Sequence, residues 1–249
     1  MRTAAEGPRV GARRETQAKA GEGIRCVVSD GTRVWVGTFG DGVLCLEKNQ
    51  WHRLWPKSVT PATRPVGFVP RAAEDTVTSL ALDGDSLWIA TLAGLRRYRI
   101  SERSLETVGE NLPAFKPIGD VSYMEPWSAL ETGPVVAKTA GRIWYSPSAR
   151  LAKGTTSGVY CLAEDRRNWK CAIPDANGRH FAEAGQYVWI ATQDGLLRYD
   201  PKTNRQARFT TRDGLTSNTI VSVAADDRYI WVGVASGVSR LNRLTFERP

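Results

Sequence analysis

Residues 220–242 read IVSVAADDRYIWVGVASGVSRLN, and residues 77–100 read VTSLALDGDSLWIATLAGLRRYRI. Two further stretches align with them: residues 24–46 read IRCVVSDGTRVWVGTFGDGVLCL, and residues 180–200 read HFAEAGQYVWIATQDGLLRYD. A weaker copy spans residues 135–162, where an insertion separates RIWYS from GVYCL. The chain therefore contains about five copies of one unit, and internal repetition of this kind decides the fold.

A tryptophan occupies the same place in each copy. These residues are Trp35, Trp88, Trp144, Trp189 and Trp231, and their successive spacings are 53, 56, 45 and 42 residues. A basic period near 42 suits a four-stranded propeller blade, and apolar residues do not recur at the helical spacing of about three to four positions. We predict an all-β fold, a β-propeller of about five four-stranded blades that forms a ring, an incomplete arc, or a ring completed by another subunit.

The order of strands and turns is similar in every copy. A first strand leads through a turn, such as Asp83-Gly84-Asp85 or Asp226-Asp227, into the strand that bears the tryptophan, and a tight turn ending in glycine leads into a third strand. A less apolar fourth strand follows at the outer rim, which in the last copy we expect near Phe246. We expect the blades at about 24–55, 77–108, 135–173, 180–210 and 220–248, all within a propeller spanning 24–249, after a flexible N-terminal tail at 1–23.

The repeated tryptophans are predicted to be core residues. Neighbouring propeller sheets pack face to face, and a large flat ring at one depth fills the gap between them. Burial of each ring stabilises the fold by several kcal/mol, at about 25 cal/mol per Å² over roughly 150–250 Å². We therefore interpret all five as core rather than as a stacking platform for a ligand.

Residues 211–243, TRDGLTSNTIVSVAADDRYIWVGVASGVSRLNR, carry a family resemblance. Its elements stand in the order Gly214-Leu215, Ser217-Asn218, Asp226-Asp227, Ile230-Trp231-Val232-Gly233 and Gly237-Val238. In this order they resemble the two-component regulator propeller repeat, over about 24 residues in each of four units. The resemblance implies a ligand-sensing propeller of a hybrid two-component system, commonly periplasmic and often responsive to carbohydrates. The third unit departs from the pattern at residues 144–147, which read WYSP.

Composition suits one large globular domain or two small ones, since the 249 residues are 41% hydrophobic and 24% charged. A run of about 18 apolar residues is absent from the sequence, and residues 1–23 lack the apolar middle of a secretory signal. As written, we expect a soluble, cytoplasmic chain without a membrane segment. If the N-terminus is incomplete, the location is periplasmic or extracellular.

The four cysteines are too few to form the framework of a chain this long. Cys161 and Cys171 could face each other across a hairpin as a disulfide, or both could be small buried hydrophobic residues.

The net charge of +8 raises the question of a nucleic-acid partner. Lysines and arginines are scattered with acids between them, and the sequence contains no run of five like charges. We therefore expect a solvated basic surface and no direct nucleic-acid binding.

Three long insertions define the predicted site. Residues 56–76 and 109–134 connect blades, and residues 146–157 join a second strand to a third, so in an antiparallel blade all three emerge on one face. Long loops on a rigid scaffold are where binding usually resides. The candidate ligand- or partner-binding residues are Arg64, Phe68, Arg71, Phe115, Lys116, Tyr123, Trp127, Arg150 and Lys153. Their cations and aromatic faces suit acidic or sugar-like ligands or an acidic protein loop; alternatively, the aromatics pin their own loops and the cations face water.

Residues for metal binding or catalysis are scarce. The two histidines, His52 and His180, have no cysteine or second histidine at metal-ligand spacing, so we expect no metal and no cofactor. Two acidic pairs lie in predicted hairpin turns, where carboxylates ordinarily form the turn rather than bind calcium: Asp83 with Asp85, and Asp226 with Asp227.

These observations favour a non-enzymatic module that binds an acidic or carbohydrate-like ligand or a protein through the loop-rich face. One alternative is a propeller enzyme, a lyase or hydrolase acting on an anionic carbohydrate, with Tyr123 or Glu125 as proton donor. Another is a structural subunit of a larger assembly, whose ring or edge other chains complete. Oligomeric state stays open.

Overall fold

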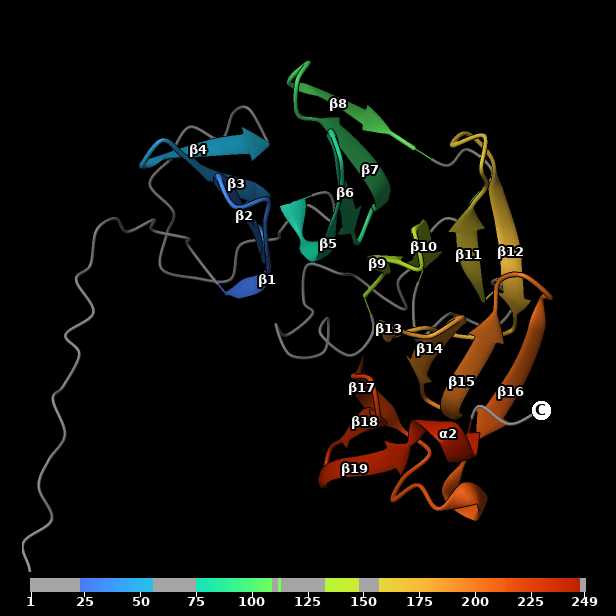
Figure 1. Cartoon of the computed structure of the whole chain (residues 1–249). Coiled ribbons are helices and arrows are strands. Elements are labelled where there is room, and N and C mark those ends of the chain that lie inside the picture. The colour runs from blue at the N-terminus through green and yellow to red at the C-terminus, as the bar shows by residue number, and fades with distance from the viewer. Residues whose placement is uncertain (1–22, 56–74, 109–111, 113–132, 148–156, 247–249) are drawn as a thin grey trace, which may run out of the picture.

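Five antiparallel sheets make up nearly all of the computed structural model, which describes residues 23–55, 75–108, 112, 133–147 and 157–246 (Figure 1). The first sheet contains β1 (Ile24–Ser29), β2 (Arg33–Thr38), β3 (Val43–Glu47) and β4 (Gln50–Trp55). The second contains β5 (Val77–Asp83), β6 (Ser86–Thr91), β7 (Gly94–Arg99) and β8 (Ser104–Thr107). The third contains β9 (Val135–Thr139), β10 (Arg142–Ser146), β11 (Gly158–Leu162) and β12 (Trp169–Pro174). The fourth contains β13 (His180–Ala184), β14 (Tyr187–Thr192), β15 (Gly195–Asp200) and β16 (Arg205–Phe209), and the fifth contains β17 (Ile220–Ala225), β18 (Tyr229–Val234) and β19 (Gly237–Asn242).

The sheets are arranged as propeller blades. Within each sheet the strands pair in chain order, and the first strands β1, β5, β9, β13 and β17 contact one another in succession. Figure 1 shows these strands toward the centre and β4, β8, β12 and β16 at the outer rim. The prediction of an all-β propeller is confirmed. The first and fifth sheets lie at the two ends of an arc that is open between them in this view.

The core consists of four interfaces between consecutive sheets. At the first, Trp35 and Val43 pack with Val77 and Leu80 of the second sheet. The other three interfaces likewise contain the tryptophan of the preceding sheet and apolar residues of the following sheet. His180 at the start of β13 binds through Nδ1 to the Val223 carbonyl at 2.9 Å, which joins the fourth sheet to the fifth.

Four of the five repeated tryptophans are core residues, as predicted. Trp35, Trp88, Trp144 and Trp189 are fully buried, whereas Trp231 is 38% exposed. Each buried ring packs against the sheet that follows it in the chain. Among the described residues no sheet follows the fifth, so the prediction that Trp231 is a core residue is wrong.

The fifth sheet has three strands rather than four. The prediction of an outer strand near Phe246 is wrong, because the short helix α2 (Arg243–Phe246) follows β19. The Asn242 side-chain oxygen accepts the Leu244 N–H at 3.0 Å, as an N-cap does. The Arg243 N–H donates to the Arg228 carbonyl at 2.9 Å and ties the start of the helix to the β17–β18 turn.

The glycine turns repeat one hydrogen-bond pattern. At the β14–β15 turn the Thr192 hydroxyl donates to the Gly195 carbonyl at 2.6 Å, and at the β6–β7 turn Thr91 donates to the Gly94 carbonyl at 3.0 Å. Gly195 has a φ of +124°, and a Cβ there would lie 2.4 Å from the Phe209 carbonyl oxygen. Both the backbone conformation and the close approach of β16 therefore require glycine.

The cysteines are free thiols. Cys161 pairs across the β11–β12 hairpin with Lys170, and Cys171 pairs with Tyr160. The two thiols are therefore not opposite each other, and Cys161 is buried whereas Cys171 is exposed. The disulfide alternative is wrong, and of the two residues only Cys161 behaves as a buried hydrophobic residue.

Candidate functional site

The three long connections join strand ends that lie on one side of the propeller. They link β4 to β5, β8 to β9 and β10 to β11. Because the strands alternate in direction across each sheet, the end of every second and fourth strand lies on the same side as the start of every first and third strand. We call this side the connection face; its flanking residues are Trp55, Val77, Thr107, Val135, Ser146 and Gly158.

The nine predicted site residues fall outside the part of the chain that the structure describes. They are Arg64, Phe68, Arg71, Phe115, Lys116, Tyr123, Trp127, Arg150 and Lys153. Glu125, the second candidate proton donor, also falls there. Their grouping on one face therefore stays a prediction.

Hydrogen bonds between neighbouring sheets fix the described ends of these connections. The Asp75 carbonyl accepts the N–H groups of Gly40 and Gly42 at 3.1 and 3.0 Å. The Pro134 carbonyl accepts the Thr78 hydroxyl at 2.5 Å. The Ser146 hydroxyl oxygen accepts the Gly178 N–H at 3.0 Å. The long segments thus begin and end at positions set by the blades, which is the arrangement expected for binding loops on a rigid scaffold.

The opposite side of the propeller carries short turns whose polar groups satisfy one another. Asp165 accepts the N–H groups of Arg167 and Asn168 at 2.9 and 3.0 Å. These bonds, with that from Asn168 the stronger, lower the pKa of the Asp165 carboxyl to about 2. Asp226 in the β17–β18 turn accepts the N–H groups of Arg228 and Tyr229 at 2.8 and 2.7 Å. The prediction that Asp226 forms a turn is confirmed.

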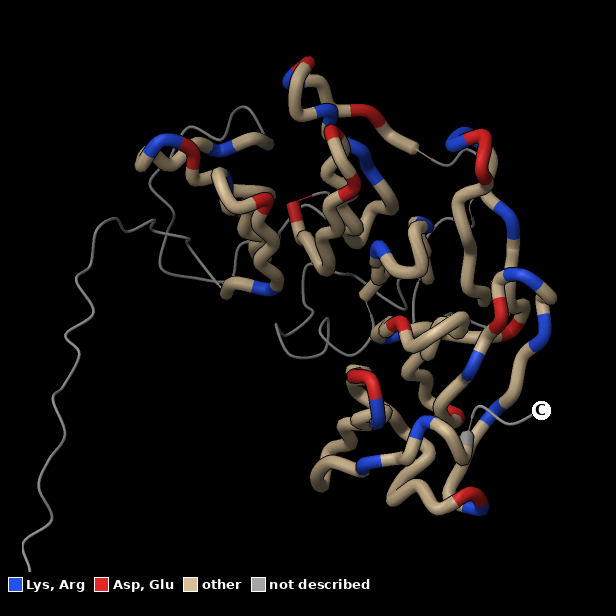
Figure 2. Tube along the Cα trace, in the orientation of Figure 1, with Lys and Arg blue, Asp and Glu red and all other residues tan. Residues whose placement is uncertain are grey.

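The other acidic pair links different parts of the chain. Asp83 forms ion pairs with Lys138, at 2.8 Å, and with Arg166, both from the third sheet. Asp85 accepts the N–H of Ser101 at 2.9 Å, and also its hydroxyl. Within the described residues no group of three or more histidine, cysteine or acidic side chains is placed to hold a metal ion. Figure 2 shows acids and bases interspersed along these sheets.

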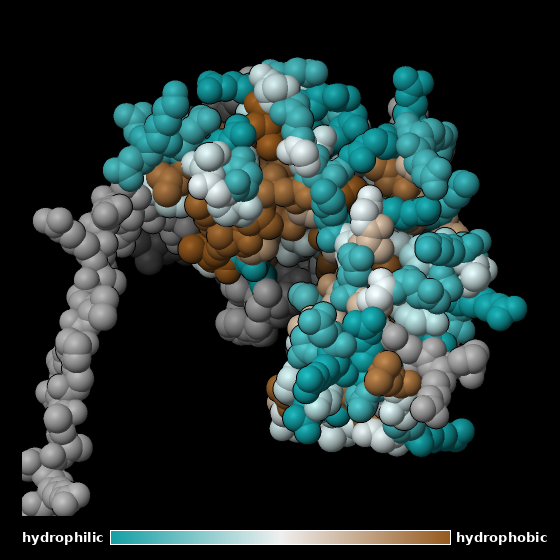
Figure 3. Space-filling view, viewed as in Figure 1, coloured by the Kyte–Doolittle hydropathy of each residue, from teal (hydrophilic) through white to brown (hydrophobic). Residues whose placement is uncertain are grey.

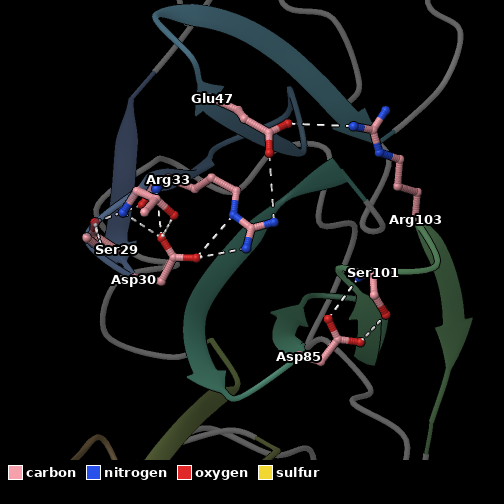
Figure 4. Close-up of polar contacts among 9 residues, drawn as sticks. Ser29, Asp30, Arg33, Glu47, Asp85, Ser101 and Arg103 are labelled. Carbon is pink, nitrogen blue, oxygen red and sulfur yellow. Dashed lines mark hydrogen bonds and ion pairs between the residues drawn. The ribbon is translucent and has the colours of Figure 1, made fainter.

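A groove of about 520 Å³, lined by both charged and apolar residues, lies between the outer parts of the first and second sheets. Figure 4 shows Arg33 between Asp30 and Glu47, at 3.1 and 3.9 Å, and Arg103 of the second sheet reaching Glu47 at 3.7 Å. The Arg33 guanidinium also lies 5.3 Å from the centre of the Trp35 ring. Charges of both signs are therefore held in place around this groove.

The cysteine that lines this groove is not suited to act as a nucleophile. This cysteine, Cys45, is buried, and burial raises the pKa of the thiol to about 11. A thiol with that pKa stays protonated at neutral pH and is a poor nucleophile.

A second groove, of about 860 Å³, lies between the third and fourth sheets at the matching place. Arg142 and Trp144 on β10 correspond to Arg33 and Trp35 on β2, and Tyr199 lines it. Between the second and third sheets, Trp169 packs edge-on against Trp88 with ring centres 5.7 Å apart. Sequence reasoning missed these grooves. The sequence does contain a feature that marks the two grooves. An arginine stands two residues before Trp35 and before Trp144, which line the grooves, but not before Trp88.

The fold is shared with solved structures of low sequence identity. The extracellular domain of a putative hybrid two component system from B. thetaiotaomicron matches with a TM-score of 0.60 and 16% identity, over 88% of this chain and 28% of that chain. The extracellular domain of a putative one component system from the same organism matches with a TM-score of 0.50 and 18% identity, over 88% of this chain and 32% of that chain. A chain of the nidogen/laminin complex matches with a TM-score of 0.55 and 7% identity, over 89% and 76%.

The class of protein is therefore a β-propeller, with a fold similar to that of the extracellular domains of a putative hybrid two component system and a putative one component system. The propeller fold that the repeat resemblance implies is confirmed. This chain spans about a third of the length of those two domains. No protein-family model matches the sequence, and no curated protein matches it either. Within the described residues, no helix has the length and apolar character needed to span a bilayer.

Proposed function

We propose that the protein is a non-enzymatic sensor or recognition propeller that binds an acidic, carbohydrate-like ligand, or an acidic protein loop, through the connection face. One observation carries the proposal: all three long connections join strand ends on the same side of the blades. On the opposite side, short turns pair their own polar groups, which leaves them fewer free donors and acceptors for a ligand.

The chemistry of the connecting segments supports an acidic ligand. They carry arginines and lysines together with phenylalanine, tyrosine and tryptophan. Cations donate charge-assisted hydrogen bonds to carboxylates, and aromatic faces stack on sugar rings or hold cations in place. The net charge of +8 favours the approach of an anion.

The structural neighbours support the sensor role and the location. Two of them are extracellular domains of putative one- and two-component systems. A periplasmic or extracellular location for this propeller follows by analogy, and so does a role in detecting a ligand rather than in converting it.

A charge-matched pair of variants tests the site. One variant carries Arg71→Ala, Lys116→Ala and Arg150→Ala. The control removes three exposed cations from turns on the opposite side of the blades: Lys48→Ala, Arg167→Ala and Lys202→Ala. Both variants lose the same net charge, so a difference between them reports position rather than total charge.

Binding to immobilised polyuronates, sulfated glycans and neutral glycans is measured at fixed salt, alongside a pull-down with acidic proteins. We expect the connection-face variant to lose at least about tenfold in affinity, since each charge-assisted contact contributes roughly 1.5 kcal/mol or more. The control should bind like the unmodified chain. Equal losses in both variants, or no loss in either, would refute the assignment.

A further inference from the structure

Each internal interface joins two different kinds of sheet face. One face, the tryptophan face, presents the repeated tryptophan and an apolar residue of the third strand. The other, the receiving face, presents aliphatic residues of the first and second strands. Between the fourth and fifth sheets, Trp189 and Leu196 of the tryptophan face pack with Ile220 and Val223 of the receiving face. At every interface the tryptophan face of one sheet meets the receiving face of the next sheet along the chain. A row of five sheets therefore leaves the receiving face of the first sheet and the tryptophan face of the fifth without a partner sheet.

The fifth sheet leaves its tryptophan face uncovered. Trp231 is 38% exposed and Val238 is 70% exposed. Val238 pairs with Gly233, two residues beyond Trp231 on β18, so both side chains lie on the same side of the sheet. The residues that correspond to Val238 in the other four sheets are at most 3% exposed: Val43, Leu95, Val159 and Leu196.

The first sheet leaves the β1 part of its receiving face uncovered, whereas Val36 on β2 and Leu44 on β3 of the same face are buried. Val27 is 55% exposed and Ile24 is 62% exposed, both on β1. The residues that correspond to Val27 in the other sheets are all buried: Leu80, Val136, Phe181 and Val223. Figure 3 shows hydrophobic surface over the first sheet on the side that borders the opening of the arc.

These two end faces have the same composition as the two halves of an internal interface. Val77 and Ile220, which stand where Ile24 stands on β1, are completely buried by the preceding sheet. The Arg240 guanidinium near the Trp231 ring does not block packing, because Arg97 lies over Trp88 in the same way inside an internal interface. The end faces are thus complementary in chemistry, yet Figure 1 places them at opposite ends of the arc.

We propose that a second copy of this chain covers the exposed tryptophan face, with its Ile24 and Val27 packed on Trp231 and Val238. Among the described residues, the first sheet holds the one receiving face whose first strand is still exposed, and every copy carries both halves of the interface. Such a contact is heterologous, so copies associate head to tail. It removes two exposed apolar surfaces from water by repeating an interface that the chain already forms internally.

Two single substitutions block one face each. Val238→Arg places a charge on the tryptophan face, and Val27→Arg places one on the receiving face; both positions are exposed, so folding of a single chain should tolerate them. Leu244→Arg on α2, at an exposed apolar residue outside both faces, is the matched control. Mass is measured by sedimentation and light scattering from about 1 to 100 μM, a range in which moderate interfaces associate.

We expect the unmodified chain and Leu244→Arg to exceed the monomer mass as concentration rises. Val238→Arg alone and Val27→Arg alone should each stay monomeric or nearly so. Their equimolar mixture should form a one-to-one dimer, because the intact receiving face of Val238→Arg fits the intact tryptophan face of Val27→Arg. Far-ultraviolet circular dichroism confirms that each variant is folded.

Three results would overturn the proposal. An unmodified chain that is monomeric at every concentration would mean that its two end faces meet each other or are covered by something else. Self-association of Val27→Arg would indicate a symmetric contact between two tryptophan faces. Failure of the mixed variants to associate would exclude the head-to-tail contact. The proposal does not depend on the ligand site, since none of these substitutions lies on the connecting segments.

Discussion

Trp189 and Trp231 occupy the same place in consecutive repeats but have different surroundings, so replacing each by alanine tests the architecture directly. Trp189 is completely buried between the fourth and fifth sheets and stacks on Phe209 with ring centres 5.7 Å apart. Trp231 keeps 38% of its surface in water. The same substitution at the two places therefore removes different amounts of buried surface.

The magnitudes follow from the burial. A fully covered indole removes roughly 200 Å² from water, worth about 5 kcal/mol as an upper estimate, and core Trp→Ala substitutions cost about 3–5 kcal/mol. We expect Trp189→Ala to lower the free energy of unfolding by about 4 kcal/mol. Roughly three fifths of Trp231 is covered, and its removal leaves a space open to solvent rather than a cavity, so Trp231→Ala should cost about 2 kcal/mol.

The assay is urea unfolding followed by far-ultraviolet circular dichroism, at a concentration where the chain is monomeric. Circular dichroism is preferred to fluorescence because the substitutions remove one of nine fluorescent tryptophans. Equal losses for the two variants would refute the interpretation of the fifth sheet as the uncovered end of the propeller. If copies associate, the loss for Trp231→Ala should grow with protein concentration, whereas that for Trp189→Ala should change less.

Two further substitutions test the turns. Gly195→Ala should lower the free energy of unfolding by about 2–3 kcal/mol, because its Cβ would approach the Phe209 carbonyl oxygen to 2.4 Å; Gly94→Ala, with a φ of +122° and no atom near its Cβ, should cost only about 1 kcal/mol. Equal thermal shifts for the two would contradict this. Asp165→Asn should flatten the acid dependence of thermal stability: a carboxyl whose pKa falls to about 2 on folding stabilises the fold above about pH 4 and ceases to do so as pH falls toward 2. An unchanged slope between pH 4 and 2 would contradict the role of the backbone N–H bonds.

The repeat carried enough information for the architecture because one residue type at the same place in every copy marks each blade. Trp35, Trp88, Trp144 and Trp189 are buried as the pattern predicted. The pattern could not show that Trp231 differs, because its own sequence context is the most regular of the five. Exposure depends on whether another sheet follows, which is a property of the neighbour and not of the unit.

Local register and chain ends were harder to predict than the repeat. A shift of one residue separates Cys161 from Cys171 across the β11–β12 hairpin, and spacing alone does not reveal it. The helix α2 replaces an expected outer strand because Asn242 caps its first turn, a local hydrogen bond that competes with strand pairing. A groove opens between the outer parts of two sheets only where no large side chain fills that space. Trp169 fills it between the second and third sheets.

Stability in such a chain is set chiefly by contacts between neighbouring units, as in other repeat architectures. Each internal unit buries both of its faces, while the first and fifth sheets each leave part of one face exposed. Terminal units of repeat proteins ordinarily present a polar outer face, yet Ile24 and Val27 at one end and Trp231 and Val238 at the other are apolar. The ends therefore retain the chemistry of internal faces. The proposed head-to-tail contact would therefore bury these two surfaces in the way that the internal interfaces bury theirs.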